Sequence, residues 1–226
     1  LLTNEILPTG LYDWVSLKVS AVRDGGMDSY IVLDDGTVHE LDMPADNELG
    51  LTIVGGLEVI ANTPSAKTID FDLRKSIVMT SLNDFKIMPV IRLVNDDEAG
   101  AIEGTIRLQE LISSNCSDFN PVTGNAVYLF NDFNASVDDI DGNGAEPFAS
   151  ALVKYDHAAA GGFGGFAYSF GFIPFGKYTA VFTCEADLDD PTSDDVIKFS
   201  STRNINVTST AVMTLGSNTF KFKKGK

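Results

Sequence analysis

The sequence contains little basic charge, few cysteines and no long hydrophobic run. Its 226 residues include 16 Lys and Arg against 32 Asp and Glu, which gives a net charge of −16. A polyanion repels nucleic acids and anionic membrane surfaces, so we expect neither as a partner. No segment approaches the roughly 20 consecutive apolar residues that a transmembrane helix requires.

The sequence also lacks a recognisable signal peptide. It begins at Leu1-Leu2 rather than at a methionine, so we expect a mature or trimmed chain. Because an exported protein can lose its signal in this way, the missing signal does not decide the compartment.

Cysteine is limited to Cys116 and Cys184, both in the second half of the chain. One reading is a disulfide, which requires an oxidising compartment. The other is a pair of free, buried thiols. The polar, loop-like flanks of both cysteines favour the disulfide.

Apolar residues make up 44% of the chain, enough for true cores, and strand patterns dominate them. One phrase occurs twice, as residues 7–12 (LPTGLY) and 173–178 (IPFGKY), each leading into an alternating run. A Pro that fixes φ, a Gly and a following aromatic residue are typical of a turn that enters a strand.

Residues 95–100 (NDDEAG) are polar and carry no periodicity. We therefore predict an all-β chain of two tandem antiparallel β-sandwich domains, immunoglobulin-like or transthyretin-like, over residues 1–97 and 100–217, with a basic tail at 218–226.

Several local expectations follow from the same patterns. Residues 68–74 alternate, which predicts a strand with Ile69, Phe71 and Leu73 pointing inward. Gly55-Gly56 is expected to interrupt a strand, and residues 149–155 fit either a strand or a helix. Trp14, the only tryptophan, is expected to pack in the core or on a sheet face, with a ligand platform as the alternative.

Four segments of the first half carry a family likeness: residues 7–12 (LPTGLY), 30–36 (YIVLDDG), 69–76 (IDFDLRKS) and 89–94 (PVIRLV). Together they resemble the family known as domain of unknown function 4382. The likeness covers about residues 1–97. This resemblance implies a bacterial envelope lipoprotein, periplasmic or outer-membrane-anchored. It also implies that the first domain lacks its native N-terminal part and that a lipid anchor there, the only expected membrane contact, has been lost.

The second half resembles the carboxypeptidase-regulatory or transthyretin-like sandwiches. The residues that carry this likeness are 104–106 (GTI), 126–129 (AVYL) and 173–180 (IPFGKYTA). Neither family supplies catalytic residues, so the resemblances imply a location and an architecture rather than an activity.

A metal hypothesis comes from residues 139–144 (DIDGNG), which match the opening of a calcium loop. Asp139, Asp141 and Asn143 would supply oxygen ligands at alternate positions, but the acidic residue that closes a twelve-residue loop is replaced by Ser150. A second acidic stretch, which includes Asp187 and Asp189 and continues through residues 194–195, could supply the missing carboxylates. The alternative is an ordinary polar turn beside a solvated acidic loop.

Signals of catalysis are weak. The two histidines, His39 and His157, lie in different halves, and the sequence has no nucleophile elbow and no His-Glu-x-x-His motif. We therefore expect a non-catalytic envelope module that binds a protein or a glycan or acts as a spacer. A calcium-dependent binding module is the first alternative, and a hydrolase of glycans or esters is the second.

Overall fold

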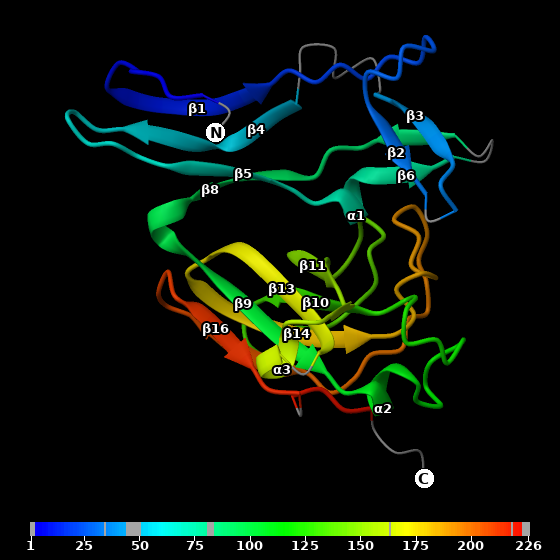
Figure 1. The fold of residues 1–226 in the computed structure, drawn as a ribbon. Coiled ribbons are helices and arrows are strands. Elements are labelled where there is room, and N and C mark those ends of the chain that lie inside the picture. Colours follow the sequence, from blue (N-terminus) through cyan, green and yellow to red (C-terminus); the bar gives the residue numbers. More distant parts are fainter. Residues whose placement is uncertain are drawn as a thin grey trace. The chain divides into compact units, whose positions relative to one another are not determined.

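A computed structural model describes residues 3–33, 35–43, 51–80, 84–162, 164–217 and 219–222, without the side chains of residues 54, 55 and 160 (Figure 1). The chain divides into two compact units, Leu1–Asn95 and Asp96–Lys226. Strands dominate both units, so the all-β prediction is confirmed. Within the described ranges, no helix is long and apolar enough to cross a membrane.

The first unit contains three small sheets. One pairs β1 (Gly10–Leu17) with β4 (Leu51–Val59), and another pairs β5 (Lys67–Phe71) with β8 (Ile91–Asn95), both antiparallel. The third has the order β2 (Tyr30–Val32), β3 (Val38–Asp42), β7 (Phe85–Ile87) and β6 (Ile77–Met79). Asp34, which lies between β2 and β3 in the sequence, is outside the described residues.

The expected interruption at Gly55-Gly56 is wrong, because β4 continues through both glycines. The register between β1 and β4 shifts between Tyr12 and Trp14, so that the two glycines lie opposite Asp13. Gly56 adopts a positive φ of 76°, which a glycine accepts without strain. The pair therefore forms a bulge inside a continuous strand.

The strand predicted over residues 68–74 ends earlier than expected. Strand β5 stops at Phe71, and Asp72 caps the short helix α1 (Leu73–Ser76) by accepting a hydrogen bond from the Lys75 backbone N–H at 3.3 Å. This change of backbone direction leaves Leu73 64% exposed, so its predicted inward orientation is wrong. Asp70 lies opposite Arg92 on β8 and forms an ion pair with it.

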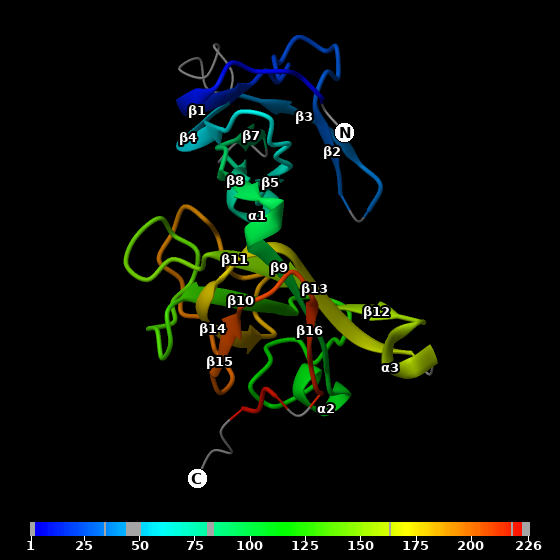
Figure 2. The same ribbon diagram turned by 90° about the vertical axis from the view of Figure 1, so that its left-hand side faces the viewer.

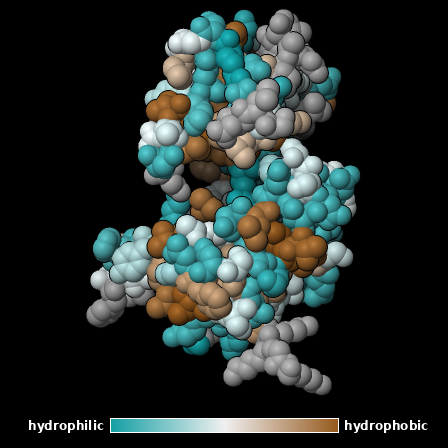
Figure 3. Space-filling view, turned by 90° about the vertical axis from the view of Figure 1, so that its right-hand side faces the viewer, coloured by the Kyte–Doolittle hydropathy of each residue, from teal (hydrophilic) through white to brown (hydrophobic). Residues whose placement is uncertain are grey.

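The core of the first unit is small. It centres on four buried side chains of the third sheet and the segment before it, Ala21, Leu41, Phe85 and Ile87. Trp14 is 61% exposed, so it is not a core residue. Apolar side chains are exposed on both units (Figure 3).

The second unit folds as two four-stranded sheets packed face to face (Figure 2). All neighbouring strands are antiparallel except β16, which runs parallel to β9. The segment 149–155, left open by the sequence, forms two short strands, β11 and β12. The first sheet has the order β11 (Ala149–Leu152), β10 (Ala126–Asn131), β14 (Gly176–Thr183), β15 (Arg203–Val207). The second has the order β12 (Lys154–Asp156), β13 (Gly165–Pro174), β9 (Ala99–Ile106), β16 (Val212–Leu215). Short helical turns precede, join or follow these strands: η2 (Asp96–Glu98), α2 (Leu108–Leu111) and α3 (Ala159–Gly162).

The main core of the second unit fills the space between its two sheets. Ile102 and Phe170 from one sheet share a cluster with Leu129 and Phe182 from the other, and each is at most 4% exposed. Burying side chains of this size stabilises the fold by about 2 kcal/mol apiece. This cluster makes the unit a sandwich.

A second, smaller core lies on the opposite face of the first sheet. Tyr128 and Phe130 of β10 alternate with the inward-facing Val127 and Leu129, and they pack with Ile140 of the β10–β11 loop. Because that loop covers the sheet, β10 is buried on both faces. This explains its continuous apolar sequence.

The repeated Pro-x-Gly phrase has one local structure in both units. The Tyr12 hydroxyl donates to the Pro8 carbonyl at 2.9 Å, and the Tyr178 hydroxyl donates to the Pro174 carbonyl at 2.8 Å. In each case the strand begins at the intervening glycine, Gly10 or Gly176. A tyrosine that ties its own strand to the preceding turn resembles the tyrosine corner of other β-sandwiches.

Candidate metal centre

Two loops of the second unit carry the acidic residues of the metal hypothesis. The β10–β11 loop, residues 132–148, contributes Asp139, Asp141 and Asn143. The β14–β15 loop, residues 184–202, contributes Asp187 and Asp189. Ile140 in the smaller core holds the first loop over Tyr128, and this brings Asp139 to the second loop.

Carboxylates from the two loops meet around Asp139. One carboxylate oxygen from each of Asp139, Asp189 and Asp195 lies within 4.8 Å of the others, and Asp139, Asp141 and Asp194 form an overlapping group of the same size. Asp139 is 1% exposed and Asp189 is 8% exposed. We call these five residues the Asp139 cluster.

Hydrogen bonds between the loops fix this arrangement. The Ile140 backbone N–H donates to Oδ1 of Asp189 at 3.0 Å, and the Tyr128 hydroxyl donates to Oδ2 of the same carboxylate. The Asp195 backbone N–H donates to Oδ2 of Asp139. Each buried carboxylate is therefore held by a partner from outside its own loop.

The electrostatics of the cluster are unfavourable to charged carboxylates. Burial raises the pKa of Asp139 above its ordinary 3.8, and the neighbouring charges of Asp141 and Asp189 raise it further. In the part of the chain that the structure describes, no basic side chain forms an ion pair with Asp139 or Asp195. Like charges held this close are stabilised by a cation between them.

Two residues of the predicted ligand set, Asn143 and Asp187, are not among the five carboxylates of the Asp139 cluster. Asn143 contacts the cluster through Asp141, because its backbone N–H donates to Oδ1 of Asp141 at 2.7 Å and its Nδ2 donates to Oδ2 at 3.3 Å. Asp187 is exposed and lies against Gly124, where an added Cβ would collide with its Oδ1. From the second loop, the structure brings the expected Asp189 to Asp139, together with Asp194 and Asp195 in place of Asp187.

Two further residues organise the site without a sequence signal of their own. Glu146 accepts backbone N–H bonds from Asp141 at 3.0 Å and from Gly142 at 2.6 Å, and it closes the first loop on itself. Tyr128 lies within a β-strand, and its role depends on the loop that crosses above it. Asp194 and Asp195 belonged to the acidic stretch already considered, but the sequence could not select them.

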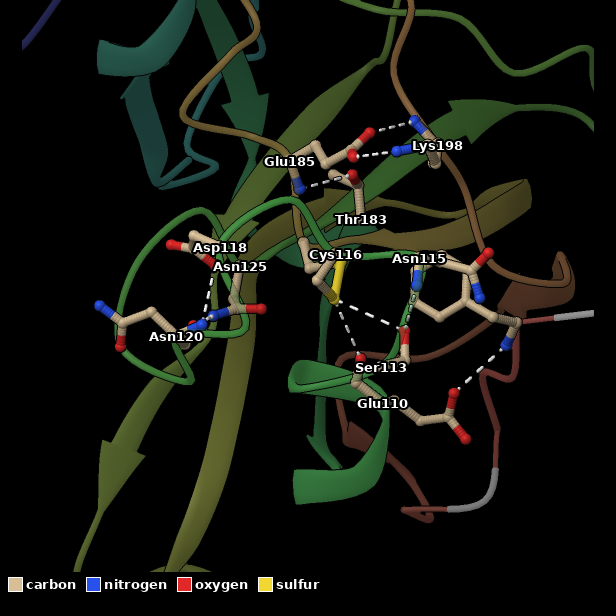
Figure 4. The surroundings of a disulfide bond; sticks show 12 residues. Glu110, Ser113, Asn115, Cys116, Asp118, Asn120, Asn125, Thr183, Glu185 and Lys198 are labelled. Atoms are coloured by element: carbon tan, nitrogen blue, oxygen red, sulfur yellow. Dashed lines mark hydrogen bonds and ion pairs between the residues drawn. A yellow bond between two sulfur atoms is a disulfide. The ribbon is translucent and has the colours of Figure 1, made fainter.

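The second loop is anchored at its base. Cys184 follows β14 and forms a disulfide with Cys116, with an S–S distance of 2.08 Å, so the predicted pairing is present. Figure 4 shows the next residue, Glu185, pointing toward Lys198. Oε1 of Glu185 accepts from Nζ of Lys198 at 2.6 Å, and Oε2 accepts from the Lys198 backbone N–H at 2.9 Å. Both bonds close the base of the 184–202 loop, because they join its start to its later part.

Asp139 should make the unfolding free energy of the metal-free protein depend on pH. Its native pKa is raised, so the native state takes up a proton before the unfolded state does. As the pH falls from neutral through that raised pKa toward 3.8, the unfolding free energy should therefore rise relative to an Asp139→Asn variant. Urea unfolding of both proteins in the presence of a chelator, at a series of pH values, measures the difference. A wild type that loses stability relative to the variant over this window would contradict the direction.

Comparison with known proteins finds a family likeness within the first unit. Residues 1–89 match the family model described as Domain of unknown function (DUF4382). No curated protein and no solved structure matches the chain. The DUF4382 match ends before Asp96–Lys226, the unit that carries the Asp139 cluster.

Proposed function

We propose that this chain is a non-catalytic module of a bacterial cell envelope whose second unit binds a calcium ion at the Asp139 cluster. The observation that carries the proposal is the meeting of carboxylates from two loops around a buried Asp139. Calcium takes six to eight oxygen ligands in flexible geometry, so five carboxylates from two loops suit it better than they suit a softer metal. The ion would tie the two loops together.

The envelope assignment rests on separate observations. The DUF4382 match covers the first unit, and the resemblance of that unit to envelope lipoproteins supports a periplasmic or outer-membrane-anchored location. The Cys116–Cys184 disulfide supports an oxidising compartment. Labelling with a fatty-acid analogue in the native host tests the anchor, and a cytoplasmic, unlabelled protein would contradict it.

The non-catalytic assignment rests on the surroundings of the histidines. His39 packs against Phe85 in the first unit, and His157 packs against Tyr155 in the second. The resemblance of the second unit to transthyretin-like sandwiches supports a binding or spacer role. A hydrolase remains the alternative to test, and turnover of glycan or ester substrates would favour it.

Calcium titration tests the metal assignment. We expect binding heat for Ca²⁺ in calorimetry and a higher melting temperature in Ca²⁺ than in chelator, because a ligand that binds only the native state stabilises it. At a calcium concentration about 100 times Kd, the gain is about 2.7 kcal/mol. Mg²⁺ at equal concentration is the control, since it prefers small octahedral sites. A chain that shows neither heat nor a melting shift does not hold calcium.

A further inference from the structure

A cleft of about 640 Å³ lies on the outer face of the sheet β12–β13–β9–β16. Thr105, Ala167 and Ser169 line it, and they alternate along their strands with core residues such as Tyr168 and Phe170. Their side chains therefore point away from the core. The volume is within the range of about 300–1,000 Å³ that is typical of small-molecule sites.

The hollow follows from side-chain size and strand register. Ala167 lies between Thr105 of β9 and Lys154 of β12, and Ser169 lies opposite Glu103. Short side chains thus form the centre, and the longer Lys154 and Glu103 stand at the border. Figure 2 shows α3 beside β13 at the β12 end of the sheet, and Ala158, Ala159 and Gly161 border the cleft there.

The polar groups of the cleft are partly unused. Glu103 accepts from the Thr214 hydroxyl at 3.1 Å through Oε1, and Asp156 accepts from the Ala158 backbone N–H at 2.8 Å through Oδ1. In the described part of the chain, the second oxygen of each carboxylate accepts no hydrogen bond. The cleft therefore offers free acceptors, hydroxyl groups and one ammonium group.

We propose that this cleft binds a neutral oligosaccharide. A sugar hydroxyl both donates and accepts, so one ligand can pair with the carboxylates of Glu103 and Asp156, the hydroxyl of Ser169 and the ammonium of Lys154. Leu152, Ala158 and Ala159 add apolar surface for the C–H faces of a sugar. The net charge of −16 disfavours acidic glycans.

This assignment names a ligand class for the proposed binding module, but it does not depend on the calcium ion. The site lies on the outer face of β13 and β9, whereas the Asp139 cluster lies over β10 of the other sheet. Saccharide binding and calcium binding are therefore measured separately.

The test is an amide NMR titration with neutral tetrasaccharides of glucose, mannose, xylose and N-acetylglucosamine, in calcium and again in chelator. We expect at least one to bind with Kd below about 1 mM and to shift the amides of Thr105, Ala167 and Ser169. Ser169→Trp fills the cleft and should weaken binding at least about tenfold. Asn206→Trp, on the exposed side of β15, is the matched control and should bind as the wild type does.

If Ser169→Trp does not fold, Glu103→Gln carries the same expectation of weaker binding. A folded wild type that binds none of the four saccharides overturns the proposal. Binding that the cleft variants leave unchanged, or binding of a zwitterionic tripeptide in place of every saccharide, overturns it too. If calorimetry detects no heat of calcium binding while the saccharide still shifts the amide resonances, only the metal assignment is contradicted.

Discussion

Removal of the Cys116–Cys184 disulfide should lower the unfolding free energy of the second unit by about 4 kcal/mol. The bond closes a loop with a sequence separation of 68 residues, and the chain-entropy model gives about this value for a loop of that length. Cys116 and Cys184 are 3% and 1% exposed, so their serine replacements also bring polar groups into the core. A loss of this size is a large part of the stability of a domain.

Urea unfolding of wild type and a Cys116→Ser/Cys184→Ser variant, with and without a thiol reductant, measures the effect. The reductant should destabilise the wild type and leave the double variant unchanged, which separates loss of the bond from other actions of the reductant. A difference below about 1 kcal/mol between the oxidised wild type and the double variant would show that the bond contributes little.

The disulfide could be predicted from the sequence because few alternatives existed. Two cysteines allow only one intramolecular pairing, and the polar flanks of both favoured it over free thiols. The strands of the second unit were visible for a similar reason, since alternation is local and its period is fixed.

Features that depend on backbone geometry over a few residues were less predictable. Leu73 continues an alternating pattern, yet the capping of α1 by Asp72 competes with the strand and prevails. Gly55-Gly56 has the composition of a break, yet a bulge opposite Asp13 absorbs it. In both cases local propensity allowed two structures, and the neighbouring chain selected one.

The residues of the Asp139 cluster were predictable as loops and only in part as individual positions. The sequence indicated that two acidic stretches could combine, and Asp139, Asp141 and Asp189 do so. The backbone N–H of Asp195 donates to Asp139, whereas Asp187 lies against Gly124, so the folded path of the second loop selects Asp195 over Asp187. That choice is a long-range property, and no spacing within the stretch encodes it.

Neutralising the cluster should have opposite effects in the two metal states. An Asp139→Asn/Asp189→Asn variant keeps the side-chain size but removes two of the five carboxylates. We expect at least about a 100-fold loss of calcium affinity, because calcium sites are tuned by the number of charged ligands. In chelator the same variant should be at least as stable as the wild type, because a repulsive pair of buried charges is gone.

The opposite effects of the double variant on stability, with calcium and in chelator, distinguish a metal site from a cluster that is only structural. If the carboxylates served only to hold the loops by accepting hydrogen bonds from Ile140 and Asp195, their neutral amides would destabilise the protein equally with and without calcium. Asp187→Asn is the matched control, because Asp187 lies in the same loop, is exposed and belongs to neither carboxylate group. Calorimetry and melting curves of the three proteins, each in Ca²⁺ and in chelator, give the comparison. A double variant that still binds calcium as the wild type does would place the ion elsewhere, whereas one destabilised equally in both conditions would make the Asp139 cluster a hydrogen-bonding scaffold.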